Sequence, residues 1–303
     1  MNLQALADQL EKKVDCQVSV HVPMKNFTTW RVGGPAELMI NPHHIEDIEN
    51  GVLFAKEYGL PITVIGNGSN LLILDGGIRG LVIKLGEFKD VSQKGDLITA
   101  EAGVMLPVLS RMACNASLSG LEFAVGIPAT LGGALVMNAG AFGQDMGSLV
   151  QEVETIDYQG NQQRLSKDEL SFSYRTSSLA RQELIILRTV LRFDPADKEE
   201  IAARMKENKA RRTRIQPMGL PSAGSVFRNP SQNYAGRLIE ELGLKGQRIG
   251  DAMVSTKHGN FIINCGCATG GEILTLIKTI QERVYEQKEI ILVPEVLIIG
   301  EEG

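Results

Sequence analysis

The sequence predicts an α+β fold in which helices and strands are mixed along the chain. Short runs rich in β-branched residues alternate with segments whose apolar residues recur at helical spacing. The alternation is irregular, unlike the regular strand–helix–strand order of a fully parallel sheet. A length of 303 residues suits two domains, each with its own core.

The first part of the chain shows the clearest periodicity. Apolar residues at helical spacing from Leu3 to Val14 predict an N-terminal helix, and Pro42 and Gly59 bracket a second helix. The predicted strands here are VSVHVP, AELMI, PITVIG, GLVIKL and LITAEAGV, and LPVLSRMACNASLSG is predicted to be a third helix.

The middle of the chain changes character. Residues 120–147 are rich in glycine and alanine and show little helix or strand periodicity, after which more strands are predicted up to LIILRTVLRF. Residues 194–200 mark a boundary, because a strand ends there in turn residues and a charged helix begins. We expect that helix to end near Ile215 and another to contain Leu238 and Leu242.

The C-terminal part adds one more helix and one strand. Thr269 and Glu272 have the spacing of a capping box at the start of the helix. The predicted strand surrounds Glu295, whose neighbours on both strand faces are apolar. Desolvation there would raise the pKa of the Glu295 carboxyl. The alternative is an edge-strand glutamate that reaches water, which Pro294 favours.

Composition narrows the class of protein. The formal net charge of −5 argues against nucleic-acid binding, and acids interrupt the N-terminal apolar residues, so we expect neither a signal peptide nor a membrane span. The cysteines lack the spacing of a zinc or iron–sulfur site, so we expect a reduced cytoplasmic protein with no protein-ligated metal. These are Cys16, Cys114, Cys265 and Cys267. We expect Cys265 and Cys267 to pack as small apolar residues at a strand end.

Two glycine-rich segments could bind a cofactor. In VIGNGSNLL, residues 64–72, glycines permit positive φ and close backbone approach to an anion such as a pyrophosphate, although the Rossmann and P-loop patterns are both absent. The small residues of 126–143 would let backbone lie against a large flat ligand. Taken together, the two segments make a nucleotide or dinucleotide cofactor as good an interpretation as the alternatives. A plain turn and a close-packed internal segment are the alternatives.

Two stretches contain notable arginines. Arg175 lies in SFSYRTSSLA between an aromatic and small hydroxyl residues, where it could bind a carboxylate or phosphate or form a surface salt bridge. The basic run KARRTRIQP, residues 209–217, suits phosphate contacts, but we interpret it as a solvated helix end that complements the helix dipole.

Ser225 in SAGSVFRNP is a candidate for catalysis, capping or a turn. The chain has only four histidines to serve as a base, and the stretch lacks the G-x-S-x-G pattern of a serine nucleophile. Chemistry at Ser225 is therefore not expected to be acyl transfer.

In order, the motifs NFTTWRVGGPA, GNGSNLL, GIPATLGGALVMNAGAFG, YRTSS, SAGSVFRNP, AGRLIEELGLKG, STKHGNFIIN and PEV resemble the UDP-N-acetylenolpyruvoylglucosamine reductases. The resemblance runs from about Phe27 to Glu301. It implies an FAD-binding unit of the vanillyl-alcohol oxidase type made of two α/β parts, followed by a C-terminal α+β substrate domain. We therefore predict an N-terminal helix and strand at 1–26, an FAD-binding domain at 27–195 split near residue 87, and a substrate domain at 196–303.

The resemblance also implies roles for individual residues. Arg175 would lie by the flavin and the substrate carboxylate, Ser225 would donate a proton, Glu295 would assist, and Asn229 would contact substrate. The implied non-covalent FAD site comprises Gly66, Asn67, Gly68, Ser69, Asn70, Leu71, Gly126, Ile127, Pro128, Thr130, Gly132, Gly133, Asn138, Ala139 and Gly140.

The implied reaction explains a serine without a histidine. NADPH would reduce FAD, and hydride from flavin N5 would reach the β-carbon of the enolpyruvyl ether of UDP-N-acetylglucosamine. Arg175 would stabilise the charge that spreads into the carboxylate, and Ser225 would protonate the strongly basic α-carbon. We expect a monomer whose partners are this substrate and NADPH, with no nucleic acid or membrane.

Two departures and two alternatives accompany the resemblance. Ala129 stands where the family commonly has glycine, and the short run after Phe193 leaves no room for the family's substrate-covering loop. A flavin oxidase of the same superfamily would be favoured by a covalent flavin on His43 or His44, which we expect at the surface. A non-catalytic nucleotide-sugar binding module would not explain Ser225 and Glu295.

Overall fold

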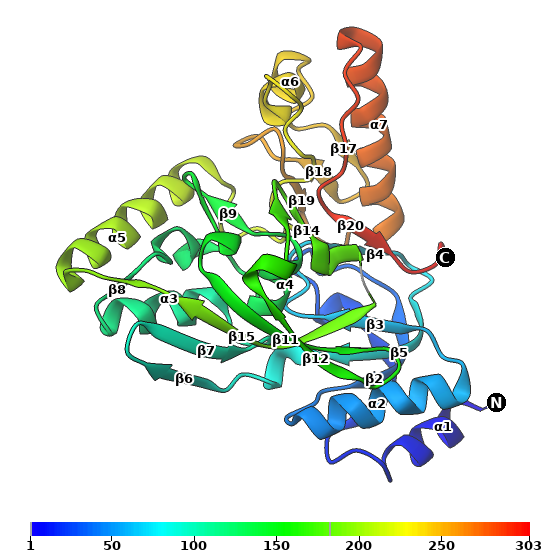
Figure 1. Ribbon diagram of the computed structural model, residues 1–303. Helices are drawn as coiled ribbons and strands as arrows, with labels where there is room; N and C mark the ends of the chain where they lie inside the picture. The colour runs from blue at the N-terminus through cyan, green and yellow to red at the C-terminus, as the bar shows by residue number, and fades with distance from the viewer. Residues whose placement is uncertain (1, 182) are drawn as a thin grey trace. The chain divides into compact units, whose positions relative to one another are not determined.

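The computed structural model describes residues 2–181 and 183–303 (Figure 1). None of the helices in these ranges is long and apolar enough to cross a membrane. The helices are α1 (Leu3–Leu10), α2 (Ile45–Tyr58), α3 (Leu106–Asn115), α4 (Leu131–Val136), α5 (Lys198–Ile215), α6 (Ala235–Glu241) and α7 (Gly270–Lys288).

Two larger sheets lie in the N-terminal two thirds of the chain. The four-stranded sheet has the order β1 (Val18–Pro23), β2 (Pro35–Ile40), β5 (Ile78–Lys84) and β3 (Ile62–Ile65), with β3 parallel to β5. The antiparallel five-stranded sheet has the order β12 (Gln162–Ser166), β11 (Val150–Asp157), β15 (Leu184–Arg192), β7 (Leu97–Glu101) and β6 (Val91–Lys94).

The remaining strands are short. Three antiparallel pairs are β8 (Leu118–Ser119) with β16 (Asp194–Pro195), β9 (Gly140–Ala141) with β10 (Gln144–Asp145), and β13 (Phe172–Ser173) with β14 (Thr176–Ser177). A three-stranded sheet contains β17 (Arg248–Ile249), β18 (Ala252–Val254) and β19 (Ile262–Asn264), and β4 (Leu71–Ile73) pairs in parallel with β20 (Leu297–Ile299).

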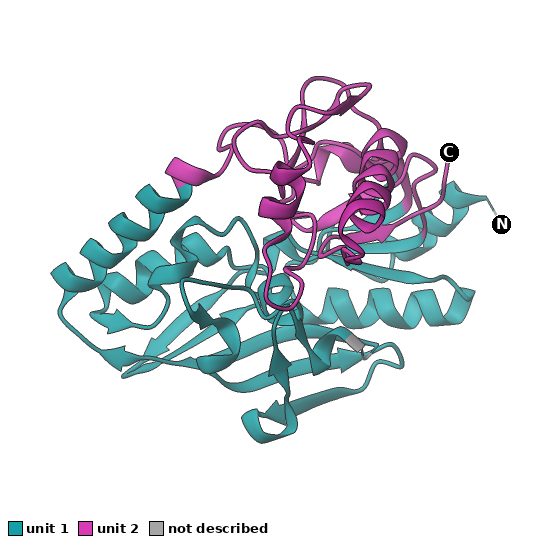
Figure 2. Cartoon of the chain, turned by 90° about the horizontal axis from the view of Figure 1, so that it is seen from above, with its two compact units in different colours: residues 1–20, 38–67, 80–212 teal, residues 21–37, 68–79, 213–303 magenta. Residues whose placement is uncertain are grey.

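The chain forms two compact units (Figure 2). Unit 1 comprises residues 1–20, 38–67 and 80–212, and unit 2 comprises residues 21–37, 68–79 and 213–303. Each unit has its own apolar core: one joins α1, α2, α3 and the larger sheets, and the other joins α6, α7 and the C-terminal strands. The units change at residue 212, whereas the domain boundary near 195 stays a prediction.

Most of the predicted elements are present, with the signals that predicted them. Gly59 ends α2 in a left-handed conformation with φ of 63°, which glycine adopts without strain. Thr269 and Glu272 form the predicted capping box of α7. The first two helix N–H groups of α7, from Gly270 and Gly271, also donate to the Asp75 carboxylate, at 2.8 Å each.

Three predictions were wrong in detail. The glycine- and alanine-rich stretch contains the helix α4, whose 6 residues are too few to give a clear helical periodicity. Glu295 precedes the final strand rather than lying in it, although Pro294 forms an isolated bridge to Phe227. Cys265 and Cys267 do follow a strand, but both are exposed rather than packed.

Candidate functional site

Residues 126–140 of the second glycine-rich segment are fixed within unit 1 by backbone hydrogen bonds. Leu131 N donates to Val104 O at 2.7 Å, and Gly132 N donates to Ala102 O at 2.8 Å. Ala129, the departure from the family pattern, accepts a 2.9 Å bond from Leu106 N at its carbonyl. The segment therefore keeps its shape through its own neighbours.

The two glycine-rich segments meet in unit 1. Asn67 Nδ2 donates to Pro128 O at 2.7 Å. A Cβ added to Gly66 would stand 2.1 Å from Thr130 Oγ1, so only glycine permits this approach. The structure thus places predicted cofactor residues from both segments side by side.

Gly133 offers a place where a flat ligand could contact bare backbone. A Cβ added there would meet only Thr130 Oγ1, at 3.5 Å, which is an ordinary van der Waals distance. The protein's own packing therefore does not require glycine at this position. An uncovered stretch of backbone in this segment fits the FAD that the resemblance implies.

Arg175 lies in the tight turn between β13 and β14 of unit 1. Its φ is 57°, its Nη1 donates to Gly140 O at 3.0 Å, and its guanidinium carbon lies 5.3 Å from the centre of the exposed Tyr174 ring. Asn138 joins the same hairpin, because its Nδ2 donates to Ser173 O at 3.1 Å. The structure thus brings predicted catalytic and cofactor residues of unit 1 together.

Asn138 itself is used inside the protein. It is 3% exposed, its Oδ1 accepts from Gly147 N at 2.9 Å, and its Nδ2 also donates to Asp145 Oδ2 at 3.2 Å. A contact of Asn138 with a cofactor would therefore have to come from its backbone.

Unit 2 holds Ser225 beside Glu295. Gly224, with φ of 77°, turns the chain just before Ser225, which is half-buried. The next residue, Val226, donates to Asn260 O at 2.9 Å and accepts from Glu295 N at 2.7 Å. The two predicted catalytic residues of this unit thus lie on neighbouring strand-like segments.

Buried Asn260 fixes the turn after Ser225. Its side-chain Oδ1 accepts from Phe227 N at 2.9 Å, and its Nδ2 donates to Phe227 O at 2.8 Å. Asn260 is 4% exposed, so both bonds are shielded from water. We did not single out this residue from the sequence, because nothing local to STKHGNFIIN marks its side chain as a partner of residue 227.

Part of the first glycine-rich segment belongs to unit 2 and contacts the same region. Asn70 Nδ2 donates to Glu295 O at 3.0 Å, and Leu297 N donates to Asn70 O at 2.9 Å. Gly68 is packed so closely that an added Cβ would stand 2.1 Å from Phe27 O. Asn70 therefore positions the backbone of Glu295.

Asn229 is exposed at the end of the Ser225 turn. Its Oδ1 accepts from Ala235 N at 3.1 Å, at the start of α6. Because the oxygen is engaged, the predicted contact with substrate would fall to the Nδ2 amide group.

Arg212 is a residue of interest that the sequence interpretation missed. Its neighbours in the basic run, Lys209, Arg211 and Arg214, are exposed as expected of a solvated helix end, but Arg212 is half-buried. Burial lowers the pKa of Arg212, and the charge of Arg175 lowers it further. Arg212 lies on the same face of α5 as the buried Ile201 and Met205, and this helical spacing could have predicted its burial.

His43 and His44 are exposed at the start of α2, as predicted, and no part of the described glycine-rich contacts involves them.

Comparisons with known proteins find matches for both parts of the chain. Residues 216–299 match the family model described as the UDP-N-acetylenolpyruvoylglucosamine reductase C-terminal domain, and residues 36–166 match an FAD binding domain. These matches confirm the predicted fold class.

Full-length relatives extend the match. The chain is 46% identical to UDP-N-acetylenolpyruvoylglucosamine reductases of Desulforamulus reducens, over 98% of this chain and 99% of that one, and of Moorella thermoacetica, over 99% of each. The crystal structure of the reductase from Thermus caldophilus is 39% identical, with a TM-score of 0.80 over 93% of this chain and 98% of that one. The chain therefore belongs to the UDP-N-acetylenolpyruvoylglucosamine reductase family.

Proposed function

We propose that this protein reduces the enolpyruvyl ether of UDP-N-acetylglucosamine enolpyruvate to UDP-N-acetylmuramate, a precursor of peptidoglycan. FAD, when bound, would supply the redox chemistry by accepting hydride from NADPH and passing it to the β-carbon of the ether. The observation that carries the proposal is the pairing of the Ser225 turn with Glu295, through the 2.7 Å bond from Glu295 N to Val226 O.

Arg175 would stabilise negative charge on the substrate carboxylate. A guanidinium presents donors in a planar fork that matches a carboxylate. The bond from Nη1 to Gly140 O fixes the orientation of the Arg175 side chain within unit 1. A fixed cation costs no reorganisation when charge develops during the reaction.

Ser225 would deliver the proton to the α-carbon. Its backbone is held by the left-handed Gly224 on one side and by the bonds of Val226 on the other. A hydroxyl in a fixed direction can protonate a strongly basic carbon without a histidine partner. Glu295, half-buried on the neighbouring segment, would assist, and Asn229 would bind substrate through its amide group.

The residues around Gly133 and Asn67 would hold FAD through the backbone. Bare backbone at Gly133 and the close approach of Gly66 to Thr130 both suit a flat, non-covalently bound cofactor. We further infer that the protein acts in the cytoplasm, where its nucleotide substrates are found. We also infer that it is a monomer. Light scattering on the purified protein tests the monomer.

A half-reaction experiment tests the function. Purified wild-type protein should be yellow, NADPH should bleach it, and the enolpyruvyl substrate should restore the colour. In Ser225→Ala, NADPH should still bleach the flavin, while reoxidation by substrate slows by about 10²–10⁴, the usual worth of a positioned acid.

Ser222→Ala is a matched control, since this serine lies in the same loop. A colourless wild-type protein that added FAD does not turn yellow would contradict the proposed function. Unchanged reoxidation in Ser225→Ala would contradict only the role of Ser225.

A further inference from the structure

One face of α5 runs along the short turn of residues 122–126. Ile201 and Met205, buried on this face, form an apolar cluster with Cys114 and half-buried Val125. Arg212 continues the same face, because residues seven apart on a helix lie almost in line. Helix α5 therefore directs Arg212 toward the start of the second glycine-rich segment.

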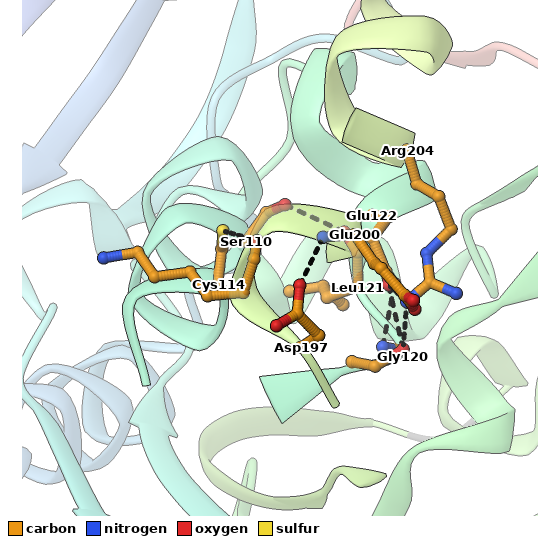
Figure 3. Close-up of polar contacts among 10 residues, drawn as sticks. Ser110, Cys114, Gly120, Leu121, Glu122, Asp197, Glu200 and Arg204 are labelled. Atoms are coloured by element: carbon orange, nitrogen blue, oxygen red, sulfur yellow. Dashed lines mark hydrogen bonds and ion pairs between the residues drawn. The ribbon is translucent and has the colours of Figure 1, made fainter. Parts of the chain in front are cut away.

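An ion pair between exposed Arg204 and buried Glu122 fixes the other end of this contact (Figure 3). Glu122 is 3% exposed and accepts from Gly120 N at 2.8 Å and from Ser119 Oγ at 2.9 Å. Arg204 Nη2 of α5 lies 3.0 Å from the Glu122 carboxylate. A carboxylate that accepts three donors holds the helix in a defined position against the turn.

Gly126 is shaped to the stem of Arg212. A Cβ added to Gly126 would stand 2.9 Å from Arg212 Cδ and 3.1 Å from Arg212 Nε. Any larger residue would displace the arginine. Gly126 does not have a positive φ, so no tight turn requires glycine there. The contact with Arg212 explains why this position has no side chain.

The Arg212 guanidinium has a donor, Nε, that lacks a hydrogen-bond acceptor among the described residues. Its Nε is buried, and no acceptor within hydrogen-bond distance of it lies in residues 2–181 or 183–303. The nearby charge of Arg175 repels it. Burying a charged donor without an acceptor, next to a like charge, is unfavourable unless an anion is bound.

We propose that Arg212 is a second cation of the reductase site, which acts with Arg175 to bind a planar, two-acceptor anion against residues 126–140. The Glu122–Arg204 pair is the positioning contact that holds α5 so that Arg212 reaches this anion. The proposal rests on the proposed function, because it requires a flavin or a carboxylate substrate.

Two sources supply an anion of this shape. One is the N–C=O edge of the flavin pyrimidine ring, which carries negative charge when the flavin is reduced. The other is the carboxylate of the enolpyruvyl substrate or of its product. Both present two acceptors in a plane, which is the geometry that a guanidinium fork recognises.

The test uses Arg212→Gln in the FAD-loaded protein, with Arg214→Gln as the matched control from the exposed part of the same helix. Sulfite titration and the two-electron midpoint potential, both without substrate, report on the flavin. Absorbance changes of oxidised flavin on adding UDP-N-acetylmuramate report on the carboxylate.

If the flavin edge is the anion, Arg212→Gln should weaken sulfite binding at least tenfold and lower the potential by about 30 mV, the value for a tenfold change in a two-electron couple. If the carboxylate is the anion, the product dissociation constant should rise at least tenfold and sulfite binding should not change. Arg212→Lys should recover part of either effect, since it keeps the charge and loses the fork.

Two results would overturn the proposal. One is that sulfite binding, potential and product binding all remain at wild-type values in Arg212→Gln. The other is that FAD-free Arg212→Gln unfolds at a lower temperature than the FAD-free wild type, because removal of a like-charge contact should leave the empty protein as stable or more stable. A wild-type protein that binds no FAD would instead contradict the proposed function.

Gly126→Ala gives an independent check, because it displaces Arg212 without removing its charge. Its effect on the ligand identified above should have the same direction as that of Arg212→Gln. The two effects should not add in the double variant, since both act through one contact. Full additivity would show that Gly126 acts without Arg212 and would contradict the proposed geometry.

Discussion

The segment that carries Ser225 and the hairpin that carries Arg175 are held by different kinds of interaction. In unit 2, Val226 and Phe227 are bonded to Asn260, and Val226 is also bonded to Glu295. In unit 1, the Arg175 side chain donates a hydrogen bond to Gly140 O and lies near the charge of Arg212. The first arrangement pairs the N–H and C=O of Phe227 with the Asn260 side chain, whereas the second brings like charges together.

Two glycines, one from each unit, differ in what surrounds them. Gly68 in unit 2 is required by the protein itself, because an added Cβ would collide with Phe27 O. Gly133 in unit 1 meets no close neighbour. The packing of unit 2 thus accounts for Gly68, whereas the packing of unit 1 does not account for Gly133.

The largest effect on stability is expected from Asn260→Ala. This change leaves the buried N–H and C=O of Phe227 without partners, at a cost of about 2–4 kcal/mol in the free energy of unfolding. Denaturant unfolding of the FAD-free protein measures it. Asn161→Ala, at an exposed position, should cost much less. Equal costs for the two variants would mean that the Ser225 segment is not held by its own hydrogen bonds.

A pair of glycine substitutions separates protein packing from ligand binding. Gly68→Ala should destabilise the FAD-free protein by about 2–3 kcal/mol, because the Cβ is crowded and φ is 61°. Gly133→Ala should stabilise it by about 0.5–1 kcal/mol, because the residue lies within α4.

The FAD affinities should complete this contrast. Gly133→Ala is expected to weaken FAD binding about tenfold, or about 1.4 kcal/mol, despite its more stable fold. Fluorescence titration of FAD into both variants checks this. If Gly133→Ala binds FAD as the wild type does, the bare backbone at this position is not the flavin surface.

The sequence predicted much of the fold and part of the site. Helices with apolar periodicity and caps, such as α2 and α7, were predicted because those signals are local. Helix α4 was not, since it has only 6 residues, two of them glycine, which is too short a run for periodicity to identify. The strand expected at Glu295 begins two residues later because its pairing with β4 depends on residues far away in the chain.

The site shows the same division between local and distant causes. Gly66, Asn67 and Arg175 were indicated by their own motifs. Asn260 acts through residues of a distant segment, Phe227, and Arg212 acts through the packing of α5 on residues 122–126. A basic run is usually a solvated helix end, and here that interpretation held for Arg211 and Arg214 but not for Arg212.

A substitution at Glu295 tests whether its side chain takes part in the reaction, in addition to its backbone hydrogen bonds. Its main chain is fixed on both sides, by Val226 and by Asn70. Glu295→Gln keeps shape and one donor group but cannot transfer a proton, so substrate binding should be near normal while flavin reoxidation slows about tenfold, or about 1.4 kcal/mol. The pH dependence of reoxidation should also change.

Stopped-flow reoxidation rates across pH measure this effect. Glu282→Gln, an exposed glutamate on α7, is the control and should match the wild type. Wild-type rates in Glu295→Gln at every pH would reduce Glu295 to a residue whose backbone alone matters.

Protonation of His258 in acid should weaken the hydrogen bonds that join Asn260 to Phe227 in unit 2. Its ring is half-buried against Phe261, and its Nδ1 accepts from Asn260 N at 3.2 Å. Burial lowers the pKa of His258 below its usual value of 6.5, and the charge of Lys245 lowers it further. The unfolded chain therefore binds a proton near pH 6.5 while the folded protein does not.

The neutral His258 ring therefore contributes its full share to the free energy of unfolding above about pH 6.5. This contribution is lost as the pH falls toward the lower pKa of His258 in the folded protein. For one proton, the free energy of unfolding falls by no more than about 1.4 kcal/mol per pH unit. His258→Gln should flatten the unfolding free energy between pH 7 and 5, and His43→Gln, at an exposed position, should not. Hydrogen exchange should show amides of 226–228 losing protection in acid before those of the Arg175 hairpin, because arginines do not titrate in this range. Simultaneous loss in both segments would erase the difference between the two units.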